Sequence, residues 1–160
     1  MSNSAASTVF STPDDTSAFA TAFAQTLVPG DVILLQGDIG AGKTHFARSA
    51  IQSLLSHPED IPSPTFTLVQ IYEAAVGEIW HADLYRLTSP DEAIELGLDQ
   101  AFEGAICFVE WPDRMGSMTP ENALTLTLKT ADQTDERVAL FEWSDSKWTA
   151  RIANLTHTTA

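Results

Sequence analysis

The feature that most constrains the fold is a glycine-rich turn at residues 37–44. It reads Gly-Asp-Ile-Gly-Ala-Gly-Lys-Thr and matches the pattern G-x-x-x-x-G-K-[ST]. The turn follows residues 32–35, an apolar run with β-branched members that is typical of a strand buried on both faces. It precedes a helical pattern in which Phe46, Ala50 and Leu54 are apolar. A strand, a glycine-rich turn and a helix in this order predict a phosphate-binding loop in an α/β protein.

The residue types of this loop suit a nucleoside triphosphate. Glycines let the backbone curl so that successive N–H groups point at the β-phosphate, and the following helix adds its dipole. Lys43 can bring positive charge to the β and γ oxygens, and the Thr44 hydroxyl can bind Mg²⁺. The expected nucleotide-binding residues here are Gly37, Asp38, Ile39, Gly40, Ala41, Gly42, Lys43, Thr44 and His45.

The remaining pattern predicts helices and strands around this unit. Thr12 suits a helix cap and Pro13 a first helical position, and Phe19, Phe23 and Leu27 then form one apolar face. Further strands are expected at residues 65–72 and 79–85, as an antiparallel hairpin, and at 105–109, 123–128 and 138–143. Further helices are expected at residues 89–97, with Ser89 as the cap, and at 145–155.

These elements fit an α/β fold, a P-loop NTPase-like three-layer sandwich with a mixed β-sheet flanked by helices. The length of 160 residues predicts a single domain. We expect residues 1–8 to be disordered and residues 156–160 to form a frayed tail.

The composition limits the partners. With 22 acidic and 8 basic residues, the net charge is −14. Direct binding to nucleic acid or to an anionic membrane needs clustered Lys and Arg, so this charge argues against both. Cys107 is the single cysteine and lies in an apolar run, so we expect a buried thiol and no disulfide-linked partner.

The chain start has neither the basic residues nor the apolar segment of a signal peptide. No apolar stretch approaches the roughly 18–20 residues that cross a bilayer. We therefore expect a soluble, cytoplasmic protein with no membrane association.

The nucleotide is expected to be ATP. A guanine-specific N-K-x-D motif is absent, because neither Lys129 nor Lys147 has the required neighbours. A small-molecule kinase usually carries arginines in a lid over the phosphates, and the arginines of this chain are scattered. ATP hydrolysis is favoured over both alternatives.

Magnesium at a phosphate loop needs a carboxylate at the end of another strand. Glu110 ends the apolar run 105–109 and fits a Walker B position with Glu in place of Asp. Trp111 follows it and would either cover the nucleotide or belong to the core. Asp83 is the second candidate, either as a metal-binding or water-orienting carboxylate or as the partner of Arg86 in a salt bridge.

Two further residues complete the candidates. Thr65 follows Ser-Pro and would either approach Mg²⁺ or the γ-phosphate, as switch loops do, or simply begin a strand. His81 is on the same strand face as Asp83 by alternation, and we interpret it as a hydrogen-bonded structural residue rather than a ligand.

Five ordered motifs together resemble the TsaE family, formerly called YjeE. They are the loop at 37–44, Ser-Pro-Thr-Phe-Thr-Leu-Val at 63–69, His-Ala-Asp-Leu-Tyr-Arg-Leu at 81–87, Glu-Leu-Gly-Leu at 95–98 and Glu-Trp-Pro at 110–112. The resemblance covers roughly residues 10–145. It implies a weak intrinsic ATPase that acts with the TsaD and TsaB proteins in forming threonylcarbamoyladenosine at position 37 of tRNA, with the tRNA held by those partners.

The resemblance also implies residue roles. Lys43 would contact phosphate, Thr44 and Glu110 would bind Mg²⁺, and Asp83 and Thr65 fall in motifs required for hydrolysis. His45 departs from the family, which usually carries Thr or Ser there, and this bears on the positioning of the α-phosphate rather than on binding.

The resulting hypothesis is a Mg²⁺-dependent ATPase that supports tRNA modification by resetting the TsaD–TsaB complex between turnovers. One alternative is a nucleotide-gated binding module, in which ATP binding drives docking and hydrolysis is incidental. A small-molecule kinase is the other alternative.

Overall fold

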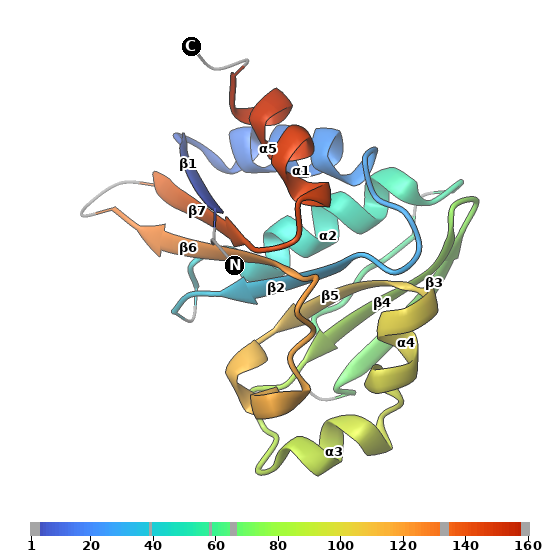
Figure 1. Cartoon of the computed structure of the whole chain (residues 1–160). Helices are drawn as coiled ribbons and strands as arrows, with labels where there is room; N and C mark the ends of the chain where they lie inside the picture. The colour runs from blue at the N-terminus through green and yellow to red at the C-terminus, as the bar shows by residue number, and fades with distance from the viewer. Residues whose placement is uncertain (1–3, 39, 58, 65–66, 132–134, 158–160) are drawn as a thin grey trace.

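The computed structural model describes residues 4–38, 40–57, 59–64, 67–131 and 135–157. They form a seven-stranded mixed sheet with helices on both faces (Figure 1), which confirms the expected α/β fold class. The strands are β1 (Ser4–Phe10), β2 (Val32–Gln36), β3 (Val69–Ala74), β4 (Gly77–Asp83), β5 (Ile106–Glu110), β6 (Leu124–Thr130) and β7 (Arg137–Trp143). The helices are α1 (Pro13–Ala24), α2 (Lys43–Leu54), α3 (Pro90–Glu95), α4 (Leu98–Gly104) and α5 (Lys147–His157), with a 3₁₀ segment, η1 (Pro112–Met118).

The strand order is β1-β7-β6-β2-β5-β4-β3. Strand β2 is parallel to both of its neighbours, β5 and β6, and β5 is parallel to β4. The outer pairs β1–β7, β6–β7 and β3–β4 are antiparallel. The carboxyl ends of β2, β4 and β5 therefore meet at one edge of the sheet, where α/β proteins commonly bind ligands.

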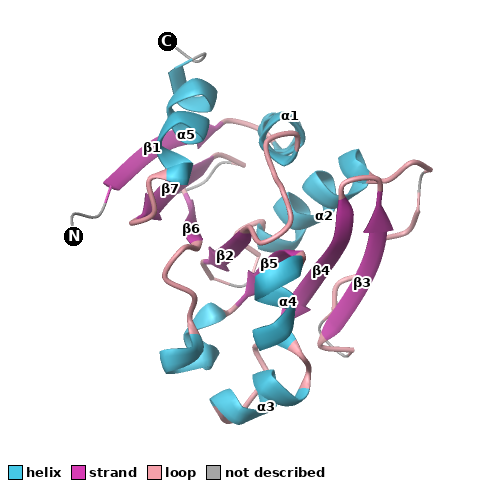
Figure 2. Ribbon diagram, turned by 45° about the vertical axis from the view of Figure 1, so that its right-hand side comes forward, coloured by secondary structure: helices cyan, strands magenta, loops and turns pink. Residues whose placement is uncertain are grey.

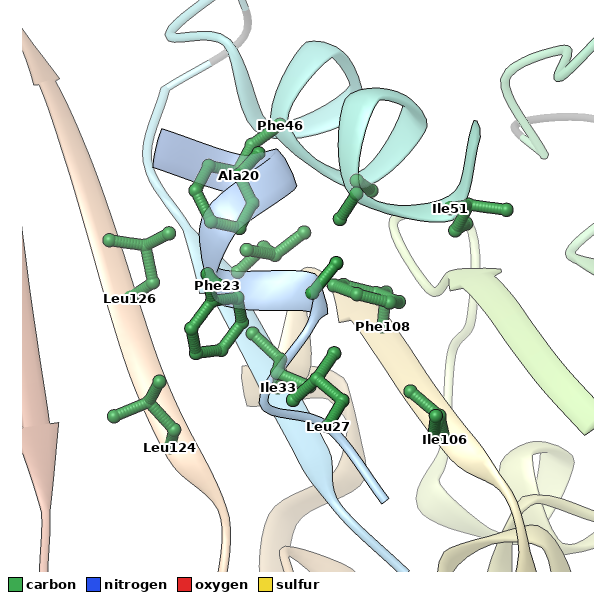
Figure 3. Close-up of a cluster of buried hydrophobic side chains, with 14 of the residues drawn as sticks. Ala20, Phe23, Leu27, Ile33, Phe46, Ile51, Ile106, Phe108, Leu124 and Leu126 are labelled. Carbon is green, nitrogen blue, oxygen red and sulfur yellow. The ribbon is translucent and has the colours of Figure 1, made fainter. Parts of the chain in front are cut away.

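One face of the sheet is covered by α1 and α2, and α5 packs beside them against α1 and β1 (Figure 2). Figure 3 shows Phe23 of α1 and Phe46 of α2 in one apolar cluster with the sheet side chains Ile33 and Phe108. Trp148 of α5 extends this core by stacking on Phe23, with 6.1 Å between ring centroids. This layer supports the helix that begins at the glycine-rich loop.

The opposite face of β2, β4 and β5 carries a second core, formed with α3, α4 and η1. Successive residues of β2 alternate between the cores, with Ile33 in the first and Leu34 in the second, so the predicted strand buried on both faces is confirmed. Cys107 is fully buried in β5, as expected, and burial raises the pKa of its thiol to about 12.

Most local sequence signals act as predicted. The Thr12 side chain accepts a hydrogen bond from the Asp15 backbone N–H at 3.1 Å, and Pro13 begins α1. The hairpin is β3–β4, with its turn between Ala74 and Gly77. Ser89 precedes α3, but its side chain makes no capping hydrogen bond.

Two expectations about the ends of the chain are wrong for the residues that are described, whereas residues 1–3 and 158–160 lie outside them. Residues 4–8 are not disordered, because they belong to β1 and pair with β7 from Ser4↔Trp143 onwards. The closing helix continues beyond residue 155 and takes in Thr156 and His157, so this part of the expected tail is helical. Helix α4 was not anticipated; Gly97, at φ 87°, separates it from α3.

Within the described residues, none of the helices has the combination of length and apolar character that crossing a membrane requires.

Candidate nucleotide-binding site

The glycine-rich loop joins β2 to α2, as the sequence pattern predicts. Gly42, at φ 105°, is the residue before the helix, and Gly40 is also left-handed at φ 84°. A Cβ on Gly37 would lie 2.4 Å from the carbonyl oxygen of Leu128, so the close approach of β6 requires glycine there. The first turn of α2 leaves backbone N–H groups without helical partners, which suits phosphate oxygens.

Thr44 and Glu110 meet at the mouth of this loop. The Thr44 hydroxyl lies 2.9 Å from Oε1 and 3.0 Å from Oε2 of Glu110, to which it donates. Glu110 ends β5 and pairs in register with Leu35 of β2, which places its carboxylate beside the loop. A hydroxyl and a carboxylate are hard oxygen donors of the kind Mg²⁺ prefers.

Asp83 lies on the adjacent strand. It ends β4 in register with Glu110, and its Oδ1 accepts a hydrogen bond from the Tyr85 backbone N–H at 3.0 Å. The side chain is 5% exposed. Two acidic residues at the ends of neighbouring parallel strands are thus brought together.

Lys43 is also buried. Its Nζ donates to the Gly37 carbonyl at 2.5 Å and lies 3.6 Å from the ring centroid of Trp111. Burial lowers the pKa of Lys43, and the charges of Glu110 and Asp83 oppose that shift. Trp111 itself has a left-handed backbone at φ 58°, which is uncommon for a bulky residue and places the indole over the lysine.

These groups line one pocket of about 380 Å³. The lining residues are Gly40, Gly42, Lys43, Thr44, His45, Asp83, Tyr85, Glu110 and Trp111. All but Tyr85 are residues that the sequence predicted for nucleotide, metal or catalysis.

A second pocket of about 280 Å³ adjoins the first through His45, Gly40 and Gly42. Its other lining residues are Pro13, Thr16, Ala41, Leu128, Asp135 and Arg137. Nε2 of His45 lies 3.0 Å from the Ser17 hydroxyl and 3.1 Å from the Pro13 carbonyl oxygen, which ties α2 to α1 between the two pockets.

Comparison of the chain with models of known protein families identifies its family. The family model described as "Threonylcarbamoyl adenosine biosynthesis protein TsaE" matches residues 10–139. The chain belongs to the TsaE family. The resemblance found from the five motifs is thereby confirmed.

Curated relatives and a solved structure agree with this family. A protein of Rickettsia bellii named tRNA threonylcarbamoyladenosine biosynthesis protein TsaE is 40% identical over 131 residues, which are 82% of this chain and 90% of that protein. A protein of the same name from Bacillus subtilis is 38% identical over 130 residues, 81% of this chain and 80% of the other. The crystal structure of YdiB from Bacillus subtilis is similar with a TM-score of 0.81 and 28% identity, covering 100% of this chain and 99% of the other.

Two predicted residues of this TsaE-family protein, Ile39 and Thr65, lie outside the described residues. Among the residues that are described, no group of three or more His, Cys, Asp or Glu side chains is arranged to hold a metal ion. A magnesium ion would therefore take only part of its ligands from the Thr44 hydroxyl and Glu110, and the phosphates and water would supply the rest.

Sequence reasoning missed one basic residue of the site. Arg137, the first residue of β7, donates from Nε to the Ala41 carbonyl at 3.1 Å and lines the second pocket. No local pattern distinguishes it from the other arginines, because only the pairing of β7 with β6 brings it to the loop.

Proposed function

We propose that this TsaE-family protein is a Mg²⁺-dependent ATPase that supports threonylcarbamoyladenosine modification of tRNA through the TsaD and TsaB proteins. The observation that carries the proposal is the contact of Thr44 with Glu110 at the start of α2, in one pocket with Lys43 and Asp83. The names of the Rickettsia and Bacillus relatives supply the pathway.

The triphosphate would lie along the first pocket, over the N-terminus of α2. Loop amides would meet its oxygens, and Lys43 would exchange the Gly37 carbonyl for a phosphate. Magnesium, when bound, supplies positive charge that stabilises the negative phosphoryl oxygens during transfer. Thr44 and Glu110 would hold it, since their oxygens already face one another.

The second pocket would accept the nucleoside part. It continues from the loop past His45 to Leu128 and Arg137, and apolar walls next to a few polar groups suit a base and a ribose. Arg137 would add a second positive charge to a site in which the sequence suggested only Lys43.

Hydrolysis requires a water molecule in line with the bond to the γ-phosphate. Glu110 or Asp83 would orient that water, because both carboxylates line the first pocket. Lys43 would balance the charge that spreads over the γ-phosphoryl oxygens.

The partner part of the proposal fits the charge of the chain. A net charge of −14 does not favour direct contact with tRNA, so the partners would hold the tRNA and this chain would engage protein and ATP.

The decisive experiment measures phosphate release from ATP by the purified chain alone and with a purified TsaD–TsaB pair. We expect slow hydrolysis that the pair stimulates, and no release by Lys43→Ala in either mixture. Absence of stimulation in every mixture would refute the partner role. Transfer of labelled γ-phosphate to an acceptor other than water would favour a kinase.

A further inference from the structure

His81 is a buried imidazole that contacts Glu110 and has no part in the hydrolysis proposed for the site. It lies on β4 two residues before Asp83 and is fully buried. Its Nε2 is 2.7 Å from Oε2 of Glu110. Its other ring nitrogen, Nδ1, is also buried and has no hydrogen-bond partner among the described residues.

The surroundings of the two ring nitrogens determine which of them carries the proton. Without a proton, Nε2 would turn a lone pair toward the carboxylate of Glu110, so Nε2 must be the donor. A proton on Nδ1 would be a buried donor without an acceptor. With its proton on Nε2, the ring donates to Glu110, and Nδ1 remains a buried nitrogen without a hydrogen-bond partner among the described residues.

The contact restrains a carboxylate that would otherwise have a single side-chain donor. Glu110 is 2% exposed; the Thr44 hydroxyl donates to both of its oxygens, and His81 donates to Oε2. Between these two donors the carboxylate is fixed in the orientation that faces α2. A residue needed only to fill the core could be apolar, whereas this position holds a polar ring aimed at the acid.

We propose that His81 is a positioning residue: its Nε2–H holds the Glu110 carboxylate in the orientation that meets Thr44 and the divalent cation of a bound nucleotide. The cation and the nucleotide rest on the proposed function, whereas the hydrogen bond does not. Outer-shell hydrogen bonds of this kind commonly change metal affinity or activity by about 10–100-fold.

The test compares His81→Gln, whose amide can still donate toward Glu110, with His81→Phe, which keeps a ring and loses the donor. Ile79→Val on the same face of β4 is the matched packing control. Binding of a fluorescent ATP analogue is measured without metal, and Mn²⁺ affinity of the nucleotide-saturated protein is measured by electron paramagnetic resonance. Steady-state kinetics then separate kcat from KM.

We expect His81→Phe to weaken Mn²⁺ binding and lower kcat by about 10-fold or more, with metal-free nucleotide affinity within about 2-fold. His81→Gln should recover most of both losses, and Ile79→Val should resemble the wild type. Unchanged Mn²⁺ affinity in a folded His81→Phe would overturn the proposal, as would a His81→Gln variant that is equally impaired. If His81→Phe does not fold, His81→Asn, whose amide is too short to reach Glu110, replaces it.

A nucleotide-free measurement separates this inference from the proposed function. ¹⁵N NMR of the unliganded wild type should show the proton of His81 on Nε2, and His81→Gln should preserve the ¹³C resonance of the Glu110 carboxyl better than His81→Phe. A proton on Nδ1, or identical Glu110 resonances in both variants, would overturn the positioning role. A wild type that neither binds nor hydrolyses ATP would instead defeat the proposed function, and these resonances would still decide the role of His81.

Discussion

Two acidic residues, Asp31 and Glu110, are almost equally buried, at 1% and 2% exposure, and lie at opposite ends of the parallel strands β2 and β5. Asp31 precedes β2 and accepts from Lys147 Nζ at 2.9 Å and from Arg151 Nη1 at 2.6 Å, both on α5. Glu110 accepts instead from the hydroxyl of Thr44 and the imidazole of His81.

The difference lies in how the charge is compensated. Two cations of the chain itself balance Asp31, and the result is a link between the sheet and α5. Glu110 is held by a hydroxyl and an imidazole, and the lysine of the site, Lys43, donates to the Gly37 carbonyl rather than to Glu110. A buried carboxylate without a full counter-charge suits an added cation. The two regions are almost equally buried and differ in how the carboxylate is compensated. We call the ion pairs of Asp31 with Lys147 and Arg151 the α5 anchor, in contrast to the site around Glu110.

The largest expected effect comes from Lys43→Ala. The change removes the charge that would meet the β and γ phosphates, so nucleotide affinity should fall by at least about 100-fold. Isothermal titration with ATP measures the loss. Lys147→Ala, which removes a lysine from the α5 anchor, is the control and should keep the wild-type affinity. Equal ATP affinity of Lys43→Ala and the wild type would contradict the placement of the nucleotide phosphates beside Lys43.

Glu110→Ala should separate binding from hydrolysis. We expect ATP to remain bound while phosphate release falls by about 100-fold, because a carboxylate that acts in the transition state has been removed. Single-turnover kinetics at saturating ATP give the rate. A variant that hydrolyses slowly yet sustains tRNA modification through many turnovers would favour the nucleotide-gated module.

Asp31→Ala, in contrast to Glu110→Ala, should lower the stability of the protein and leave its hydrolysis of ATP nearly unchanged. It leaves two cations without their buried partner, so the free energy of unfolding should fall by about 3 kcal/mol, while kcat stays within about 2-fold. Urea unfolding followed by circular dichroism measures the change, and Glu110→Ala is the matched buried-acid control. A loss of activity in folded Asp31→Ala would break the distinction between the two regions.

The smallest effect is expected for Arg151→Met, because Lys147 still pairs with Asp31 and the methionine keeps much of the packing on Trp148. The free energy of unfolding should fall by about 1 kcal/mol, since the arginine is partly exposed to solvent.

Cys107 supplies a sensitive measurement of this change. Its backbone N–H donates to the Asp31 carbonyl, and its thiol, with a pKa of about 12, is unreactive while it is buried. The rate at which a thiol reagent labels Cys107 should rise about 5-fold in Arg151→Met. Rapid labelling of the wild type would contradict the burial of this thiol.

The sequence predicted the site where the signal is local. The loop was found because its glycines and Lys43 are contiguous, and Glu110 because an acid ends an apolar run. The parallel pairing of β4 with β5 brings Asp83 and Glu110 together, which the sequence did not predict, because Asp83 lay inside the expected strand 79–85.

Other features depend on contacts between distant segments. Residues 4–8 are the small residues Ser, Ala and Thr, and they form β1 because β7 offers a partner strand. Arg137 reaches the loop through the same late strands. His81 was interpreted from its residue type and its strand face, and neither of these identifies its partner Glu110, 29 positions away.

The two outermost strands affect how readily molecules of this protein associate in concentrated solution. β1 and β3 are the edge strands of the sheet that the described residues form, and Val9 and Ile71 on them are each 50% exposed. Such edges invite strand addition between molecules. A net charge of −14 keeps molecules apart at neutral pH, but this repulsion vanishes near the isoelectric point of about 4.3. Colloidal stability, and with it the buffers in which this protein can be concentrated, thus depends on the same acid excess that disfavours contact with tRNA.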